Sequence, residues 1–174
     1  MLTAALKGDR LLLNRNHDLA NFDCGKSALN DFLVRYALQN HSGGGARTYV
    51  LTRGAEVVGY SSLAPASVVI DDTPPRVGKG QGYYPLPVIL MARFALDEVE
   101  QGKGLGKVLL RDALRRALGG ADTIGGRTLV VHAKDEDAVS FYRKFGREPS
   151  PTNPFTLFLL FKDIRHTLEL QANS

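Results

Sequence analysis

The sequence predicts an α/β domain, and three features of the chain indicate this class. A nearly continuous apolar run at 87–97, PVILMARFALD, has the composition of a strand buried on both faces of a sheet. Helix-like and strand-like segments alternate after it, which is typical of two strands flanking a crossover helix. The 174 residues, 44% of them hydrophobic, suffice for one domain with a substantial core and are short for two. We therefore expect a single domain over residues 1–174.

The chain before this run is predicted to form a strand, a helix and a hairpin. RLLLNR at 10–15 is the strand. The helix begins after Gly25, and its apolar residues lie at i, i+3, i+4 and i+7, on one buried stripe, until the glycines of 41–45 end it. These apolar residues are Leu29, Phe32, Leu33 and Tyr36. RTYVLTR at 47–53 and VVGYSSL at 57–63 are rich in β-branched and aromatic residues and predict the hairpin.

Two further segments lie on either side of the apolar run. Residues 71–87 are rich in proline and glycine and lack periodicity, so we expect a connection that is functional or disordered. After the loop at 101–106, apolar residues at i, i+3, i+4 and i+7 predict a helix, which the pair Gly119-Gly120 is expected to end. These apolar residues are Leu110, Ala113, Leu114 and Ala117.

The last part of the chain is predicted to form a strand, a short helix and a final strand. RTLVVHA at 127–133 is the first strand. DEDAVSFYRKFG is the helix, with Asp135 as its N-terminal cap and Gly146 as its C-terminal stop. TLFLLF at 156–161 is the last strand.

The loop QGKGLGKVLL at 101–110 is the first candidate site. It does not match the dinucleotide pattern G-x-G-x-x-G, because the sixth position counted from Gly102 is Lys107. It does not match the triphosphate pattern either, because Val108 follows where serine or threonine is needed. A glycine-rich turn at the start of a helix still suits an anionic group, since the first backbone N–H groups are unpaired there. The alternative is a turn that only reverses the chain.

Composition limits the other functions. Twenty-two Lys and Arg against eighteen Asp and Glu give a net charge of +4, compatible with a nucleic acid or a phosphorylated cofactor as partner. One cysteine, Cys24, excludes an internal disulfide and a cysteine-based zinc cluster, so we expect a cytoplasmic protein. We find no signal peptide and no apolar run long enough for a membrane span. The histidines lack metal-ligand spacing, so we expect no metal and a structural role for each. They are His17, His41, His132 and His166.

Two blocks resemble the GNAT family of acyl-CoA N-acetyltransferases. The first is Gln101, Gly104 and Gly106 after the central strand, where the family has Gln or Arg, two residues, Gly, one residue, and Gly or Ala. The second block has Asp where the family has Asn and Arg147 where it has Phe; it comprises Asp135, Ala138, Tyr142 and Gly146. The first departure leaves the contact of that side chain open, and the second concerns packing. The resemblance implies an α+β sandwich with a mixed, mostly antiparallel central sheet flanked by helices, and acetyl-CoA bound between two central strands.

Within that family, residues 18–162 resemble the GNAT toxins of bacterial toxin-antitoxin pairs. The resemblance is carried by FDCGKSALNDFL, GYSSLAPASV, the loop, AKDEDAVSFYRKFG and the closing PTNPFTLFLL. It implies acetylation of the free amino group of aminoacyl-tRNA, which stops translation. It also implies a ribbon-helix-helix antitoxin as a partner and a homodimer. The alternative is an N-acetyltransferase for a small amine or a protein amino terminus.

The resemblance also implies site residues. Tyr142 is the expected catalytic acid, which protonates the departing thiolate; the alternative is an ordinary core aromatic. The expected acetyl-CoA contacts are Phe94, Ala95, Leu96, Gln101, Gly102, Lys103, Gly104, Leu105, Gly106, Lys107, Asp135 and Ala138. The expected substrate contacts are Arg93, Arg47, Arg76 and Lys79. Arg93 interrupts a buried strand, so it either pairs with a carboxylate or faces an anionic substrate. The row Lys103, Lys107, Arg111 and Arg115 is a solvated face or a contact for phosphates.

The central strand lacks a glutamate, and this bears on which amine accepts the acetyl group. Many GNAT enzymes carry a glutamate on the central strand as a base, and PVILMARF has no carboxylate. An α-amino group has an ordinary pKa of about 7.7–8.0, and an adjacent ester lowers it, whereas lysine has about 10.4. An aminoacyl ester therefore needs no strong base, which favours it over a lysine acceptor, unless a water relays the proton to a more distant group.

Overall fold

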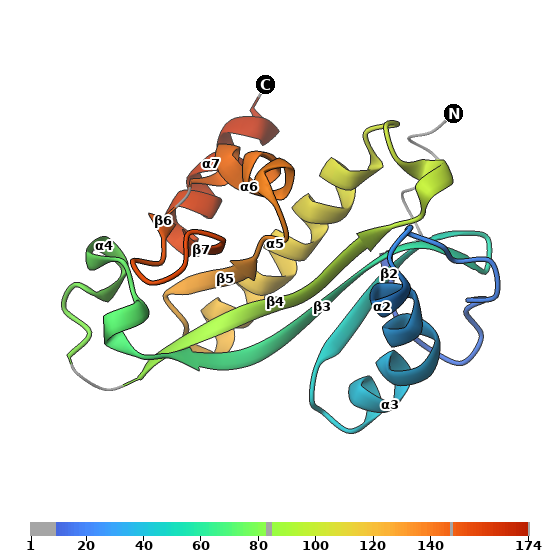
Figure 1. The fold of residues 1–174 in the computed structure, drawn as a ribbon, viewed down its shortest axis with the longest axis horizontal. Coiled ribbons are helices and arrows are strands. Elements are labelled where there is room, and N and C mark those ends of the chain that lie inside the picture. Colours follow the sequence, from blue (N-terminus) through green and yellow to red (C-terminus); the bar gives the residue numbers. More distant parts are fainter. Residues whose placement is uncertain (1–9, 83–84, 147, 174) are drawn as a thin grey trace. The chain divides into compact units, whose positions relative to one another are not determined.

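The structure, a computed structural model, describes residues 10–82, 85–146 and 148–173. The described residues form two compact units. The first contains those up to Ala64 together with Ala92–Ala113, and the second contains those of Pro65–Met91 and from Leu114 onward. Three elements run from one unit into the other, namely β3 (Glu56–Val68), β4 (Leu86–Leu96) and α5 (Leu105–Ile124) (Figure 1). The expectation of a single domain over 1–174 stays a prediction.

The predicted hairpin forms the sheet of the first unit. β2 (Arg47–Arg53) pairs antiparallel with β3, from Arg47↔Leu63 to Arg53↔Glu56. β1 (Arg10–Leu12) adds to the other edge of β2 and is shorter than the predicted strand at 10–15. The prediction of a strand and a hairpin in this part of the chain is therefore confirmed.

The helical segment of the first unit differs from the prediction in one place. It consists of α2 (Ser27–Asp31), a π-helical turn η1 (Phe32–Tyr36) and α3 (Ala37–Ser42). Phe32 and Leu33 are buried as expected, but Tyr36 is 53% exposed and Ala37 is buried in its place. A π turn closes its hydrogen bonds over one more residue than an α turn, so the next inward position moves from 36 to 37. The placement of Tyr36 on the buried stripe was wrong.

A parallel pair with its crossover helix is also confirmed. β4 pairs in parallel with β5 (Thr128–His132), from Ile89↔Leu129 to Met91↔Val131, and α5 connects them. β5 pairs antiparallel with β7 (Thr156–Leu160), which pairs antiparallel with β6 (Glu148–Pro149). The strands hydrogen-bond in the order β1-β2-β3-β4-β5-β7-β6. A mixed, mostly antiparallel sheet with helices is the predicted fold class.

The crossover helix is longer than predicted. Gly119-Gly120 do not end α5, which continues to Ile124. Gly125 ends it instead, with a φ of 94° that favours glycine. Glycine inside a helix costs only about 1 kcal/mol relative to alanine, which the packing of a 20-residue helix offsets. The pair at 119–120 was therefore a misleading stop signal.

Other elements near the predicted connections are ordered. Residues 71–87 contain the end of η2 (Ile70–Asp72) and a short α4 (Pro75–Gly78), whose Val77 is fully buried. The sequence analysis missed α7 (Phe161–Ala172), which follows β7 directly. Its buried residues, Phe161, Ile164 and Leu168, have spacings of three and four that could have identified it. In the described part of the chain, no helix combines the length and the apolar character needed to cross a membrane.

Candidate functional site

The glycine loop belongs to the first unit, where a short turn joins β4 to α5. Asp97 begins this turn by capping η3 (Glu98–Glu100): its Oδ1 accepts the Val99 N–H at 3.1 Å. The side-chain amide of Gln101 donates a hydrogen bond to the Leu96 carbonyl at 3.0 Å, which connects the loop to the end of β4. The first loop residue therefore has a positioning contact within the protein.

Gly102 and Gly104 account for the shape of the loop. Their φ angles are 77° and 82°, a region that residues with a side chain rarely adopt. A Cβ at either glycine would meet no protein atom within 4 Å, so the space beside the loop is open. α5 begins immediately afterwards at Leu105, and the N–H groups of its first turn have no partner inside the helix. This arrangement suits an anionic group such as a phosphate.

A buried acidic residue anchors the loop. Glu100 has a side chain that is only 7% exposed, and it accepts two hydrogen bonds of 2.8 Å from the Arg53 guanidinium on β2. Lys103 lies 3.7 Å from the same carboxylate. The hydrogen bonds from Arg53 hold the pKa of Glu100 below its ordinary value, so the carboxylate is ionised and paired. The sequence analysis did not single out this pair, because its members lie 47 residues apart.

The other predicted cofactor residues of the first unit divide between core and surface. Ala95 and Leu96 have buried side chains, as expected for residues that would contact a ligand through their main chain. Leu105 packs with Leu51 and Leu109 in an apolar cluster, so its side chain belongs to the core. Lys103, Lys107 and Gln101 are exposed. Phe94 packs at the edge of the same cluster as Leu105.

Arg93 makes a contact that was not predicted. Its guanidinium carbon lies 3.7 Å from the centre of the Phe32 ring, a cation-π contact. The ring shields one face of the guanidinium and leaves its N–H groups, which lie in the plane, for other acceptors. The contact joins β4 to the π-helical turn within the first unit. Arg93 is half-buried, and its contact with an anionic substrate stays a prediction.

The tyrosine of the second block lies in the second unit. Tyr142 is the last residue of α6 (Glu136–Tyr142) and is 6% exposed. Its ring packs edge-on against Phe141 with centroids 5.3 Å apart. Burial raises the pKa of its phenol above the ordinary value of 10, so the hydroxyl stays protonated and able to donate at neutral pH. The aromatic is thus both a core residue and a suitable proton donor.

Asp135 starts this helix, as predicted. Its Oδ1 accepts the Ala138 N–H at 2.8 Å, and the 3-10 turn η4 (Arg143–Phe145) follows α6 before Gly146. The contact left open for Asp135 is therefore a helix cap, which Asn would make equally well. Gly146 has a φ of 83°, in agreement with its predicted role. Arg147, the other departure from the family pattern, lies outside the described residues.

The basic residues predicted to contact the substrate belong to different units of the structure. Arg47 on β2, in the first unit, donates to the His41 carbonyl at 3.2 Å. Arg76 on α4, in the second unit, contacts Asp163 at 2.7 Å and Glu148 at 3.0 Å. These two carboxylates hold its guanidinium in an ion-pair network, and its contact with the substrate stays a prediction. Lys79, just after α4, is exposed.

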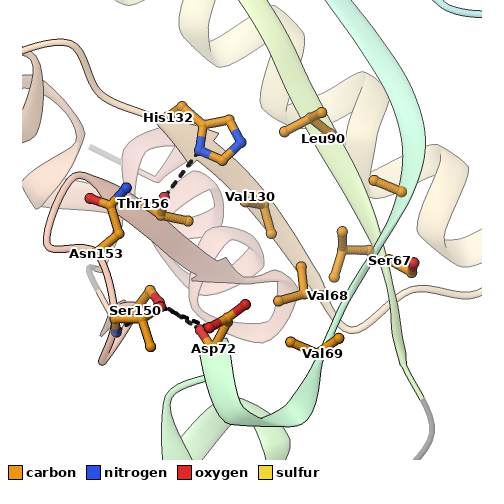
Figure 2. A pocket seen from close by; sticks show the side chains of 13 residues that line it. Ser67, Val68, Val69, Asp72, Leu90, Val130, His132, Ser150, Asn153 and Thr156 are labelled. Carbon is orange, nitrogen blue, oxygen red and sulfur yellow. Dashed lines mark hydrogen bonds between the residues drawn. The ribbon is translucent and has the colours of Figure 1, made fainter.

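A pocket of about 480 Å³ in the second unit was not predicted. Figure 2 shows Val68, Leu90 and Val130 on one side of it and a row of polar side chains, including His132, on the other. The His132 Nδ1 lies 3.1 Å from the Thr156 Oγ1.

By contrast, His17 and His41 accept backbone N–H groups, as expected of structural histidines. The four described histidines offered no spacing that would have distinguished His132. No group of three or more His, Cys, Asp or Glu in the described ranges could hold a metal ion.

Comparisons with known proteins connect these features. Residues 44–146 match the acetyltransferase (GNAT) domain. The chain is 47% identical over 148 residues to the tRNA-acetylating toxin of Mycobacterium tuberculosis, covering 85% of this chain and 89% of that protein. It is 29% identical to AtaT complexed with acetyl-methionyl-tRNAfMet, with a TM-score of 0.82, covering 91% of this chain and 98% of that one. A tyrosine-to-phenylalanine variant of AtaT, bound to the C-terminus of the antitoxin AtaR and to acetyl-CoA, is 28% identical, with a TM-score of 0.76 and coverage of 92% and 97%.

Proposed function

Because the chain belongs to the GNAT acetyltransferase family, we propose that it transfers an acetyl group from acetyl-CoA to the amino group of aminoacyl-tRNA. In this proposal the chain is the toxin of a toxin-antitoxin pair and blocks translation. The observation that carries the proposal is the loop that opens α5, where two positive-φ glycines leave the backbone open to an anion. The relatives support the acceptor, since one is named a tRNA-acetylating toxin and another is bound to an acetylated aminoacyl-tRNA.

We propose these roles for the residues of this chain. The backbone N–H groups of residues 102–107 bind the pyrophosphate of acetyl-CoA, and Lys103 and Lys107 are exposed residues of the same segment that phosphates could approach. The main chain of 94–96 pairs with the pantetheine arm. Acetyl-CoA supplies an activated thioester carbonyl and a thiolate leaving group. The Tyr142 hydroxyl donates its proton to that thiolate, for which its raised pKa suits it.

The location and partners belong to the same proposal. An aminoacyl-tRNA acceptor places the protein in the cytoplasm. A ribbon-helix-helix antitoxin is the proposed regulator, supported by the relative that is bound to the C-terminus of its antitoxin. The proposed assembly is a homodimer. Arg93, Arg47 and Lys79 are the candidate contacts for the acceptor RNA.

The test is acetyl transfer from labelled acetyl-CoA to a pool of charged tRNAs. We expect label on charged tRNA and none on uncharged tRNA. Transfer only to small amines or to protein amino termini would replace this acceptor with the alternative one. The absence of transfer to every charged tRNA would exclude the proposed function.

A variant tests the acid. We expect Tyr142→Phe to bind acetyl-CoA as the wild type does and to lose about 100-fold or more in kcat, since a positioned acid contributes at least that much. Isothermal titration measures the binding and a single-turnover assay measures the chemistry. A variant with unchanged kcat would remove Tyr142 from the mechanism.

A further inference from the structure

The pocket of the second unit is built from four strands, the turn η2 and the loop before β7. The end of β3 contributes Val68, β4 contributes Val88 and Leu90, and β5 contributes Val130, which together form an aliphatic wall. β7 and the loop before it contribute hydroxyl and amide groups, among them Ser150, Asn153 and Thr156 (Figure 2). The volume of about 480 Å³ is of the size that holds a small organic group.

The charges of the pocket identify the kind of ligand. None of the described residues that line it is a lysine or an arginine, so this lining does not suit a phosphate group. Its one carboxylate, Asp72, is engaged: Oδ1 accepts the Thr152 hydroxyl at 2.8 Å, and the Asp72 carbonyl accepts the Ser150 hydroxyl at 2.7 Å. An aliphatic wall beside neutral donors and acceptors fits an amine that carries an aliphatic substituent.

His132 is the one imidazole among the described side chains that line the pocket, and an imidazole can act as a general base. It is the last residue of β5, directly after the end of the parallel pairing at Met91↔Val131. Ligands of α/β sheets commonly bind at the carboxyl ends of parallel strands. The position therefore combines a proton acceptor with the edge of the sheet at which a substrate is expected.

Thr156 fixes the orientation of this ring. The two residues are directly opposite in the antiparallel pairing of β5 with β7, and the Thr156 Oγ1 lies 3.1 Å from Nδ1. Within the described residues, Nε2 has no hydrogen-bond partner of its own. When Nδ1 donates its hydrogen to Oγ1, Nε2 has a free lone pair, and the same contact persists after Nε2 is protonated. The contact is therefore compatible with the tautomer that a base requires, in which Nδ1 carries the hydrogen and Nε2 does not.

We propose that this pocket receives the aminoacyl group of the acceptor and that His132 is the base that takes the proton of the attacking amine. The inference rests on the proposed function and names the part of the substrate that enters the pocket, an amino acid with an aliphatic side chain. As the amine nitrogen bonds to the carbonyl carbon, it loses a proton to Nε2. The C–S bond breaks and the sulfur takes the proton from Tyr142. The imidazolium and the phenolate then exchange their protons with solvent, which restores both groups.

This assignment explains why the central strand lacks a glutamate. An imidazole is a weak base that can accept a proton from an α-amino group made acidic by its ester, but it is a poor match for a lysine, whose pKa is about 10.4. His132 therefore supports transfer to an aminoacyl ester and disfavours transfer to lysine side chains. The expectation that His132 is merely structural is replaced by this role.

Variants at both positions test the proposal, with acetyl transfer to charged tRNA as the readout. We expect H132Q to lower kcat/KM about 100-fold and to remove one ionisation from the acid side of its pH profile. T156V keeps the ring but loses its anchor, so we expect a smaller loss, which T156S restores. H166Q, at an exposed histidine on α7 that does not line the pocket, is the matched control and should match the wild type.

The outcomes separate the two proposals. Wild-type protein that acetylates no charged tRNA would exclude the proposed function itself. Wild-type transfer combined with an H132Q variant that keeps its activity, or that loses activity without losing the ionisation, would overturn the role of His132. Far-ultraviolet circular dichroism and acetyl-CoA affinity, both expected to be unchanged in H132Q, establish that the variant is folded and binds the co-substrate.

Discussion

Replacing Arg53 by methionine should destabilise the protein and loosen the glycine loop at the same time. Arg53 makes both hydrogen bonds of 2.8 Å to Glu100, the residue just before Gln101. Methionine keeps most of the length of the side chain and removes its charge. The variant leaves a buried carboxylate whose remaining cation is Lys103, at 3.7 Å. The substitution therefore removes two hydrogen bonds from Glu100, the residue that anchors the loop.

The magnitude follows from the burial of the two partners. Removing one partner from a fully buried ion pair costs about 3–5 kcal/mol, and a fully exposed pair contributes about 0–1 kcal/mol. The Glu100 side chain is 7% exposed and the Arg53 side chain is 37% exposed, so this pair lies between the two limits. We expect Arg53→Met to cost about 2 kcal/mol at pH 7, or about 4–8 °C in Tm for a chain of this size.

The pH dependence of the loss has a definite sign. The pKa of Glu100 is lowered in the folded protein, so the pair stabilises the fold above the ordinary pKa of a glutamate and loses its effect as pH falls through the lowered value. Urea unfolding of wild type and Arg53→Met should therefore differ most near pH 7, and the difference should shrink as the pH falls below the ordinary glutamate pKa of about 4.3 and vanish below the lowered pKa of Glu100.

Two further variants make the test specific. Glu100→Gln leaves a cation that water can reach, so its cost should be smaller than that of Arg53→Met. The double variant should be more stable than Arg53→Met, because no charge is left buried alone. A loss below about 0.5 kcal/mol for Arg53→Met, or a difference that persists at low pH, would refute the reasoning. Weakened acetyl-CoA binding in the same variant is the expected effect on the loop.

Two other predictions concern helix ends. Asp135→Ala removes the cap of α6 and should cost about 1 kcal/mol in urea unfolding, whereas Asp135→Asn should keep most of the stability; equal losses would argue against capping. Gly119→Ala should stabilise by about 0.5–1 kcal/mol, since the residue lies inside α5 with open space around it, whereas Gly125→Ala should destabilise by about 1 kcal/mol, because its φ is 94°. Melting temperatures that shift in the same direction in both glycine variants would contradict the observed end of α5.

Elements whose residues show the pattern within one continuous segment could be predicted from the sequence. The hairpin, the parallel strands and the capped α6 were all predictable, because side-chain periodicity and capping residues act within a few positions. The family resemblance rested on similarly short blocks and is confirmed by the matches over most of the chain. α7 carried an apolar spacing of the same kind and was overlooked.

In the candidate site, too, features that depend on neighbouring residues could be predicted, and contacts between distant residues could not. The glycine turn was predicted from its spacing and Tyr142 from the family resemblance, and the positive φ angles of Gly102 and Gly104 agree with the predicted turn. The Arg53 contact to Glu100 and the Arg93 contact to Phe32 were beyond prediction, since each joins residues more than 40 positions apart.

By itself, the sequence determined most of the order of the elements, the glycine turn before α5 and the helix that carries Tyr142, because these depend on neighbours along the chain. Only the tertiary structure decided which polar side chains have hydrogen-bond or ion-pair partners within the protein. Arg76 contacts two carboxylates, whereas His132, which lines the pocket, has within the described residues a hydrogen-bond contact to Thr156 at Nδ1 and none at Nε2. The physical reason is that burial and hydrogen-bond satisfaction depend on partners that strand pairing brings together from distant positions.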